Sequence, residues 1–75
     1  MSHVLDVKGL ACPLPVLRAK KAMKPLPPGE VLEVLATDPG TVEDFKAFCE
    51  TTGHGLVAWS EADGIYSFRI RKKGG

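Results

Sequence analysis

The stretch VLDVKGLACPLP, residues 4–15, joins a short apolar run to a motif with two prolines. The run Val4–Val7 predicts a buried β-strand that ends at Lys8-Gly9. Pro13 suits the first position of a helix, because the amide at that position has no partner within the helix. We therefore expect a strand, a turn and then a helix, with Cys12 at the mouth of that helix.

Cys12 is the candidate reactive residue. A helix N-terminus carries partial positive charge, so it favours the thiolate, which is the reactive form of cysteine. Pro13 and Pro15 lack a backbone donor, and only Leu14 and Val16 can donate to the sulfur from the first turn. We expect the prolines to fix the helix start and expose the sulfur, with a modest stabilisation of the thiolate.

The remaining chain predicts five further elements. The first helix runs from about Pro13 to Met23 or Leu26, where prolines and Gly29 stop it. A second helix begins at either of two competing caps, Asp38 or Thr41, and runs to about Thr52, where Gly53 ends it. Apolar runs predict strands over Glu30–Ala36, Leu56–Glu61 and Ile65–Arg71, the last two joined by the hairpin signal Asp63-Gly64.

The order βαβαββ predicts an α+β fold, a two-layer α/β sandwich. A strand–helix–strand unit requires a parallel pair, and the final hairpin is antiparallel. We expect a mixed four-stranded sheet with two helices on one face. Residues 1–75 form one domain, and residues 72–75 are expected to be a flexible tail.

Composition excludes several classes of protein. The 75 residues carry a net charge of +1, which argues against strong attraction to nucleic acid or to an acidic membrane. No apolar run can span a bilayer, and no secretory signal is visible. The two cysteines match neither a disulfide scaffold nor a zinc ligand set. We expect a cytoplasmic protein with free thiols and no metal.

The first helix has an unusual outer face. Its core side comprises Val16, Ala19, Ala22, Met23 and Leu26. The outer half combines two leucines with basic residues: Leu14, Leu17, Arg18, Lys20, Lys21 and Lys24. Two scattered surface leucines need no explanation. Their position within a turn of Cys12 instead favours a docking surface for acidic partners.

Four other residues each allow two interpretations. Cys49 fits a buried apolar position, or it is a thiol that pairs with Cys12. His54 caps or packs beside Gly53, and a functional role is the alternative. Asp38 caps the second helix or contributes to docking at the carboxyl end of its strand. Trp59 fits the core and the surface equally well.

The pattern resembles the TusA/SirA-like sulfur carrier family. The resemblance rests on the Cys-Pro-x-Pro core of residues 6–15, on Pro28-Gly29-Glu30 and Asp38-Pro39, and on Phe48-Cys49 with Gly53-His54. It covers about residues 4–73, including the basic C-terminal end. In this resemblance Cys12 is the catalytic residue, and Gly9, Pro13 and Pro15 support the motif.

The resemblance implies a persulfide carrier that acts as a sulfurtransferase-type relay rather than as an enzyme with a small-molecule substrate. Cys12 would accept a sulfane sulfur from a cysteine desulfurase or a rhodanese-type donor. It would pass the sulfur to an acceptor of the TusD/DsrE type, for example toward 2-thiouridine in tRNA. Sulfur oxidation and molybdenum cofactor metabolism are alternative destinations. The family implies a monomer that needs no cofactor and binds neither nucleic acid nor membrane.

Three rival functions remain. A terminal Gly74-Gly75 is similar to ubiquitin-like carriers, but those begin with a hairpin, whereas this chain begins strand, helix, strand. A redox or metal module would use Cys12, Cys49 and a histidine, without support from their spacing. In a regulatory or interaction domain, Cys12 would only pack.

Overall fold

The computed structural model describes residues 3–74 and contains the expected elements in the expected order. They are β1 (His3–Asp6), α1 (Leu14–Met23), β2 (Val31–Ala36), α2 (Thr41–Thr52), β3 (Gly55–Ala62) and β4 (Ile65–Arg71). The predicted order βαβαββ is therefore confirmed, and β4 has the predicted bounds. The expected flexible tail includes Gly75, which lies outside the described residues.

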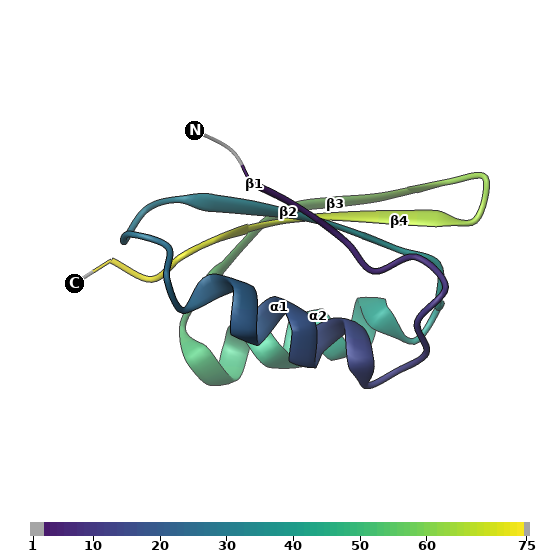
Figure 1. Ribbon diagram of the computed structural model, residues 1–75, viewed down its shortest axis with the longest axis horizontal. Helices are drawn as coiled ribbons and strands as arrows, with labels where there is room; N and C mark the ends of the chain where they lie inside the picture. Colours follow the sequence, from purple (N-terminus) through teal and green to yellow (C-terminus); the bar gives the residue numbers. More distant parts are fainter. Residues whose placement is uncertain (1–2, 75) are drawn as a thin grey trace.

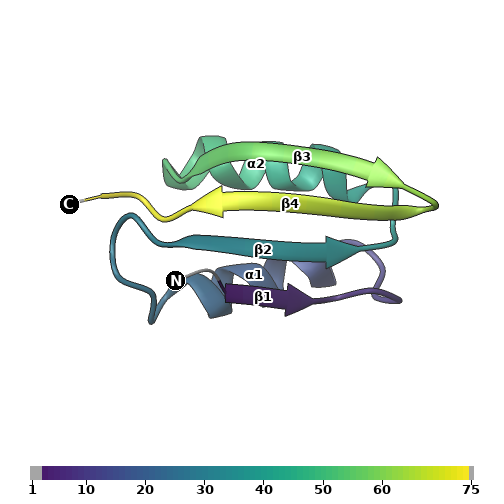
Figure 2. The ribbon, with the colours of Figure 1, turned by 90° about the horizontal axis from the view of Figure 1, so that it is seen from above.

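The four strands form one mixed sheet in the order β1-β2-β4-β3 (Figure 2). β1 and β2 are parallel, as the strand–helix–strand unit requires. β4 pairs antiparallel with both β2 and β3. The carboxyl ends of β1 and β2 therefore lie at one edge of the sheet, and the loops that lead into the two helices leave from that edge.

Both helices cover the same face of the sheet, so the molecule has two layers, as predicted (Figure 1). Alternate residues of β2 and β4 point into the interface between the layers, among them Val34 and Phe68, which are fully buried. Phe45 of α2 packs on Phe68 with ring centroids 4.7 Å apart. The sheet's other face is open to solvent, because no helix covers it.

The first strand differs from the prediction in which of its residues are buried. Val4 is 63% exposed, although it was expected to face the core. Leu5 and Val4 are neighbours in a strand, so only one of them can face the helices. Val7 lies one residue beyond the strand and is 1% exposed. The loop after β1 therefore continues the core.

The start of α1 differs slightly from the prediction, whereas the end of α2 agrees with it. α1 begins at Leu14 with Pro13 at its N-cap, so the proline inside the helix is Pro15, which is fully buried. Leu26 lies beyond the helix but still packs against the core. α2 ends at Gly53, which has φ 84° and donates its amide to the carbonyl of Cys49, as the prediction required.

The backbone of Lys72 and Lys73 is held by hydrogen bonds, in contrast to the expected frayed tail. The Lys72 amide donates to the carbonyl of Glu30 at 2.7 Å, and the Lys72 carbonyl accepts the amide of Gly29 at 3.0 Å. The Lys73 amide donates to Nδ1 of His54 at 2.9 Å. These contacts attach the end of the chain to the loops at the end of the molecule opposite Cys12.

Candidate functional site

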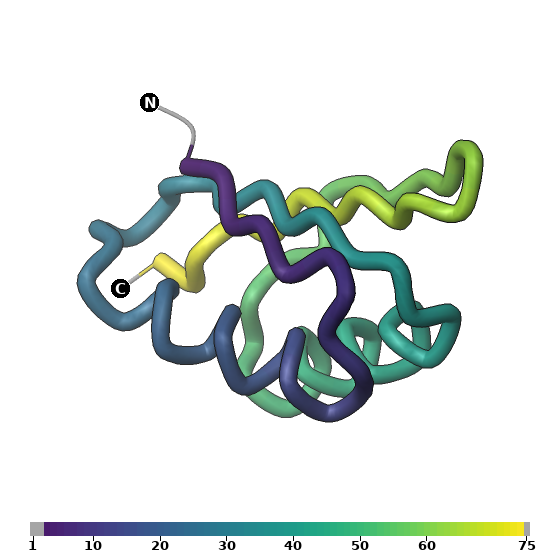
Figure 3. Tube along the Cα trace, turned by 45° about the vertical axis from the view of Figure 1, so that its right-hand side comes forward, coloured from purple at the N-terminus to yellow at the C-terminus, as the bar shows by residue number. Residues whose placement is uncertain are grey.

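Two loops place Cys12 at a corner of the molecule. The first links β1 to α1 and contains Cys12, and the second links β2 to α2 and contains Asp38. Figure 3 shows that both loops lie on the same side of the molecule, away from the N- and C-termini. The Gly9 amide donates to the hydroxyl of Thr37 at 2.9 Å, and the Cys12 amide donates to Oδ2 of Asp38 at 2.6 Å. The parallel pairing of β1 and β2 thus fixes the backbone of Cys12 against the second loop.

Glycine is required at the turn that leads toward Cys12. Gly9 has φ 85°, a conformation that side chains with a Cβ rarely adopt. A Cβ there would meet nothing within 4 Å, so the requirement comes from the backbone alone. This is a physical role for the motif residue Gly9.

The sulfur of Cys12 is exposed and donates a hydrogen bond to Oδ2 of Asp44, which lies in the first turn of α2. This bond raises the pKa of the Cys12 thiol above its ordinary value. Slight desolvation and the negative charges of Asp44 and Asp38 raise it further. The expectation that the helix mouth favours the thiolate is therefore wrong for this structure, in which two carboxylates disfavour the thiolate.

The Leu14 amide at the start of α1 is bonded to the preceding loop. The Leu14 amide donates to the carbonyl of Ala11 at 2.9 Å, and the Leu17 amide donates to the carbonyl of Pro13. Leu14 is one of the two donors that the sequence offered to the sulfur, and it is occupied elsewhere. The helix mouth therefore positions Cys12, while the carboxylates set its charge.

Asp38 holds the loop and does not cap α2. Its Oδ1 accepts the amide of Gly40 at 3.0 Å while its Oδ2 accepts the amide of Cys12, and these two bonds lower the pKa of Asp38. Gly40 occupies the N-cap of α2, with no side-chain cap. Both proposed caps are therefore wrong: Thr41 is the first helical residue, and its buried hydroxyl donates to the Asp38 carbonyl.

An apolar groove of about 350 Å³ runs between α1 and α2 and starts beside Cys12. Its α1 side includes Leu17 and Lys20, and its α2 side includes Asp44 and Phe48. Leu14 and Leu17 are 45% and 54% exposed, so the two leucines are on the surface, as the helical wheel predicts. Arg18, Lys20 and Lys21 are exposed on the same helix, and Lys24 is exposed at its C-cap.

Sequence reasoning missed Asp44 and the groove. In the sequence, Asp44 stands three residues after Thr41, which is the spacing of a helix capping box. Its contact with Cys12 depends on how α1 and α2 pack, and that packing joins residues 32 positions apart. An acidic residue in the first turn of a helix has a common structural explanation, so the sequence carried no separate signal for it.

The second thiol and the histidines form no second site with Cys12. Cys49 is 6% exposed within the core, and burial raises its pKa, which confirms the apolar interpretation. His54 packs against Phe48 with ring centroids 5.6 Å apart and accepts the Lys73 amide. Among residues 3–74, no group of three His, Cys, Asp or Glu side chains could hold a metal ion.

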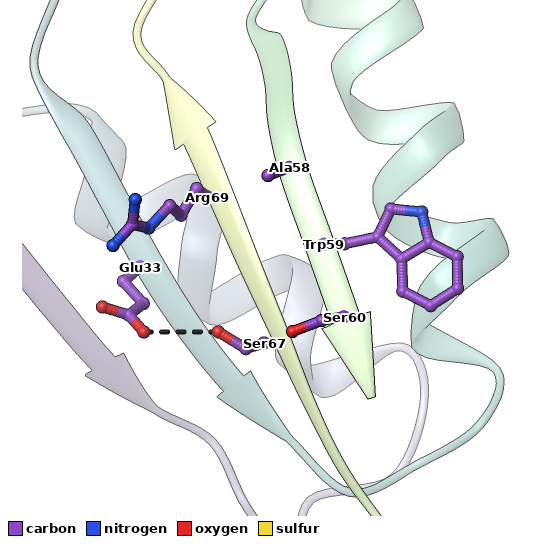
Figure 4. Close-up of a pocket in the computed structure, with 6 residues that line it drawn as sticks. All are labelled: Glu33, Ala58, Trp59, Ser60, Ser67 and Arg69. Carbon is purple, nitrogen blue, oxygen red and sulfur yellow. Dashed lines mark hydrogen bonds between the residues drawn. The ribbon is translucent and has the colours of Figure 1, made fainter. Parts of the chain in front are cut away.

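A second depression, of about 300 Å³, lies on the open face of the sheet (Figure 4). Its polar side chains are Glu33, Ser60, Ser67 and Arg69, and Ser67 donates to Glu33 at 3.2 Å. Trp59 points to the other side of β3, toward α2 (Figure 4). Its indole is 43% exposed and stacks on Phe68, so Trp59 lies at the margin of the core. This depression contains no nucleophilic thiol.

In the part of the chain from residue 3 to residue 74, neither helix has the length and apolar character needed to cross a bilayer.

Comparisons with known proteins match nearly the whole chain. The family model described as "Sulfurtransferase TusA" matches residues 3–72, a range that contains Cys12, Asp38 and Asp44. A protein named sulfur carrier protein TusA from Allochromatium vinosum is 52% identical over 68 residues, which are 91% of this chain and 90% of that protein. A protein of the same name from Pseudomonas aeruginosa is 46% identical over 70 residues, covering 93% of this chain and 89% of the relative. The crystal structure of a SirA-like protein from Desulfitobacterium hafniense matches with a TM-score of 0.84 and 31% identity, covering 97% of this chain and 99% of that chain.

Proposed function

The chain belongs to the TusA sulfurtransferase family, and from this premise we propose that it is a sulfur carrier that bears sulfur on Cys12 as a persulfide. The observation that carries the proposal is the exposed Cys12 sulfur, held at a corner by a loop whose Gly9 and Cys12 amides are both bonded to the loop before α2. A carrier must be loaded by one protein and unloaded by another, so its sulfur has to be accessible to both.

The transfer that we propose is an exchange between sulfur atoms. The Cys12 sulfur attacks the outer sulfur of a donor persulfide, the donor S–S bond breaks, and the donor leaves as a thiolate. The thiol proton of Cys12 is released, and the donor thiolate takes up a proton. No net oxidation occurs, so the step needs no cofactor. Unloading repeats the same exchange on an acceptor thiol.

The partners that we propose are proteins. The donor is a cysteine desulfurase or a rhodanese-type protein, and the acceptor is a relay protein of the TusD/DsrE type. The outer face of α1, with Leu14, Leu17 and Lys24, is the docking surface nearest to Cys12. Apolar anchors surrounded by basic side chains suit an acidic rim on the partner. A reducing compartment such as the cytoplasm suits a carrier whose thiol must stay free.

Mass spectrometry of the intact protein tests the role of Cys12. The purified chain is incubated with a cysteine desulfurase and L-cysteine and measured without reductant. We expect the wild type to gain the mass of one sulfur atom and Cys12→Ser to gain nothing. Cys49→Ser is the matched control, because it removes the buried thiol and should still load. Sulfur bound to a folded Cys12→Ser protein would refute the proposal.

The destination of the sulfur is the second part of the proposal. We place 2-thiouridine synthesis in tRNA first, with sulfur oxidation and molybdenum cofactor metabolism as the alternatives. Affinity capture from the native host with the persulfidated protein as bait distinguishes them. Recovery of a TusD/DsrE-type acceptor together with a tRNA-thiolating enzyme supports the first destination. Recovery of enzymes of sulfur oxidation or of molybdenum cofactor synthesis supports an alternative.

A further inference from the structure

We propose that the Asp44 carboxylate accepts the proton of the Cys12 thiol as this sulfur attacks an S–S bond. The inference rests on the proposed function, in which Cys12 is the attacking group. It adds a second catalytic residue, supplied by α2, to a site that the sequence assigns to the loop before α1.

The contact geometry supports this role. The Cys12 Sγ–H donates directly to Oδ2 of Asp44, so the proton already points at the base. Among residues 3–74, the Asp44 carboxylate has no ion pair and no other side-chain partner. It lies in the first turn of α2, where the helix N-terminus favours its negative charge.

No other charged group near the sulfur has the same position. Asp38 faces Cys12 from the loop before α2, but both of its oxygens already accept backbone amides. Lys20 faces Asp44 across the groove from α1, and a lysine ammonium has no acceptor. The same contact with Asp44 raises the pKa of the Cys12 thiol, so the carboxylate that receives the proton also disfavours a free thiolate before attack.

The step balances as a proton-coupled exchange. The Cys12 sulfur forms a bond to the attacked sulfur, the old S–S bond breaks, and its electron pair leaves on the departing thiolate. The thiol proton moves to Asp44 and passes from there to solvent or to the departing thiolate. Asp44 ends the cycle as a carboxylate, and no oxidant or reductant is consumed.

The rate of exchange with a small aromatic disulfide tests the proposal without any partner protein. The probe releases a coloured thiolate when Cys12 attacks it, and the rate is followed from mildly acidic to alkaline pH. The thiol pKa is measured separately from the ultraviolet absorbance of the thiolate. Glu43→Gln is the matched control, since it removes an exposed carboxylate from the same turn of α2. Cys12→Ser measures any reaction at Cys49.

For the wild type we expect a rate that stays nearly level below the thiol pKa, because the pair of thiol and carboxylate is the reacting species. Asp44→Asn lacks the base, so its rate should follow the thiolate fraction and fall about tenfold for each pH unit below its own thiol pKa. Asp44→Glu should restore much of the level region. Glu43→Gln should match the wild type.

A wild-type rate that falls tenfold per pH unit below the thiol pKa overturns the proposal, even if no Asp44 variant folds. Equal pH profiles for the wild type and a folded Asp44→Asn protein overturn it as well. Failure of the carrier function is a separate result. Exchange with the disulfide as expected, together with no sulfur gained from a desulfurase, would retain the base and reject the carrier.

Discussion

Two carboxylates divide the control of Cys12 between its backbone and its side chain. Asp38 accepts the Cys12 amide, and Asp44 accepts the hydrogen of the thiol. The first contact fixes where the residue is, and the second fixes its protonation. Gly40 lies beside both residues, since a Cβ at that position would be in ordinary van der Waals contact, 3.5 Å from Oδ1 of Asp38 and 3.8 Å from Cβ of Cys12.

Replacement of Asp38 by alanine should loosen the Cys12 loop without unfolding the protein. The amides of Cys12 and Gly40 lose their acceptor and should exchange with solvent faster. Sulfur loading should slow, because Cys12 then samples positions away from Asp44. Hydrogen exchange followed by NMR measures the first effect, and intact-mass kinetics measure the second.

Asp6→Ala is the control for this prediction. Asp6 also ends a strand and accepts a backbone amide, that of Lys8 at 3.0 Å, but it is not bonded to Cys12. Its loss should leave the exchange of the Cys12 amide unchanged. If the Cys12 amide exchanged at the same rate in Asp38→Ala and in the wild type, Asp38 would have no role in positioning.

At the residue scale, the sequence predicted that the Cys12 sulfur is exposed but not which carboxylates face it. The two prolines after Cys12 and the positive φ at Gly9 are local features, so the sequence could indicate an exposed cysteine beside a helix. The pKa of that cysteine depends on Asp44, which approaches only when α2 packs beside α1. The N-terminus of α1, whose Leu14 amide is bonded to Ala11, does not offset the rise in this pKa that the two carboxylates cause.

At the scale of elements, the two helices form one working surface. Both begin at the edge of the sheet where β1 and β2 end, so Cys12 and Asp44 meet at one end of the groove between the helices. The groove continues past Phe48 toward a further depression, lined by Lys24, His54 and Lys72 among others. A partner that docks along α1 would therefore lie over a groove that begins beside Cys12.

Leu17→Asp should weaken the binding of the sulfur donor or acceptor and leave the fold almost unchanged. Leu17 is 54% exposed, so the free energy of unfolding should change by about 0.5 kcal/mol or less. An aspartate in the groove removes an apolar anchor and adds a charge that repels an acidic partner. Calorimetric titration with a cysteine desulfurase, together with chemical denaturation, measures both quantities.

Val57→Asp is a matched control for Leu17→Asp. Val57 is an aliphatic residue with 59% exposure on β3, away from the groove. We expect the desulfurase to bind this variant like the wild type. Equal affinity of the wild type and Leu17→Asp for every donor and acceptor would show that the outer face of α1 is not the docking surface.

Element boundaries were predictable where one residue decides them. Gly53 ends α2, and Asp63-Gly64 separates β3 from β4, as the sequence indicates. The start of α2 was not predictable in this way, because the Asp38 carboxylate accepts the Cys12 amide from a loop that is distant in sequence and does not cap the helix. The exposure of Val4 likewise depends on which face of β1 meets the helices.

For the whole molecule, alternating apolar runs and two proline-marked helix starts were enough to predict a two-layer sandwich. The strand order β1-β2-β4-β3 was not predicted, since strand pairing is set by contacts between distant parts of the chain. The same limit applies to the C-terminal end. The Lys72 amide donates to Glu30, the Lys72 carbonyl accepts the Gly29 amide, and the Lys73 amide donates to His54. These bonds give residues 72–73 a fixed place that composition does not indicate.

His54 makes the stability of the whole fold depend on pH. Its Nδ1 accepts the Lys73 amide, which requires an unprotonated nitrogen, and desolvation and the charges of Lys72 and Lys73 lower its pKa below 6.5. Below that pH the unfolded chain binds a proton that the folded chain resists. The contribution of His54 to the free energy of unfolding is thus present above pH 6.5 and is lost as the pH falls toward the folded pKa.

We expect urea denaturation between about pH 8 and about pH 5 to show a steeper loss of stability for the wild type than for His54→Gln, which cannot titrate. The carboxylates are common to both proteins, so the difference between the two curves isolates His54. Parallel curves would show that His54 has the same proton affinity in the folded and unfolded chains.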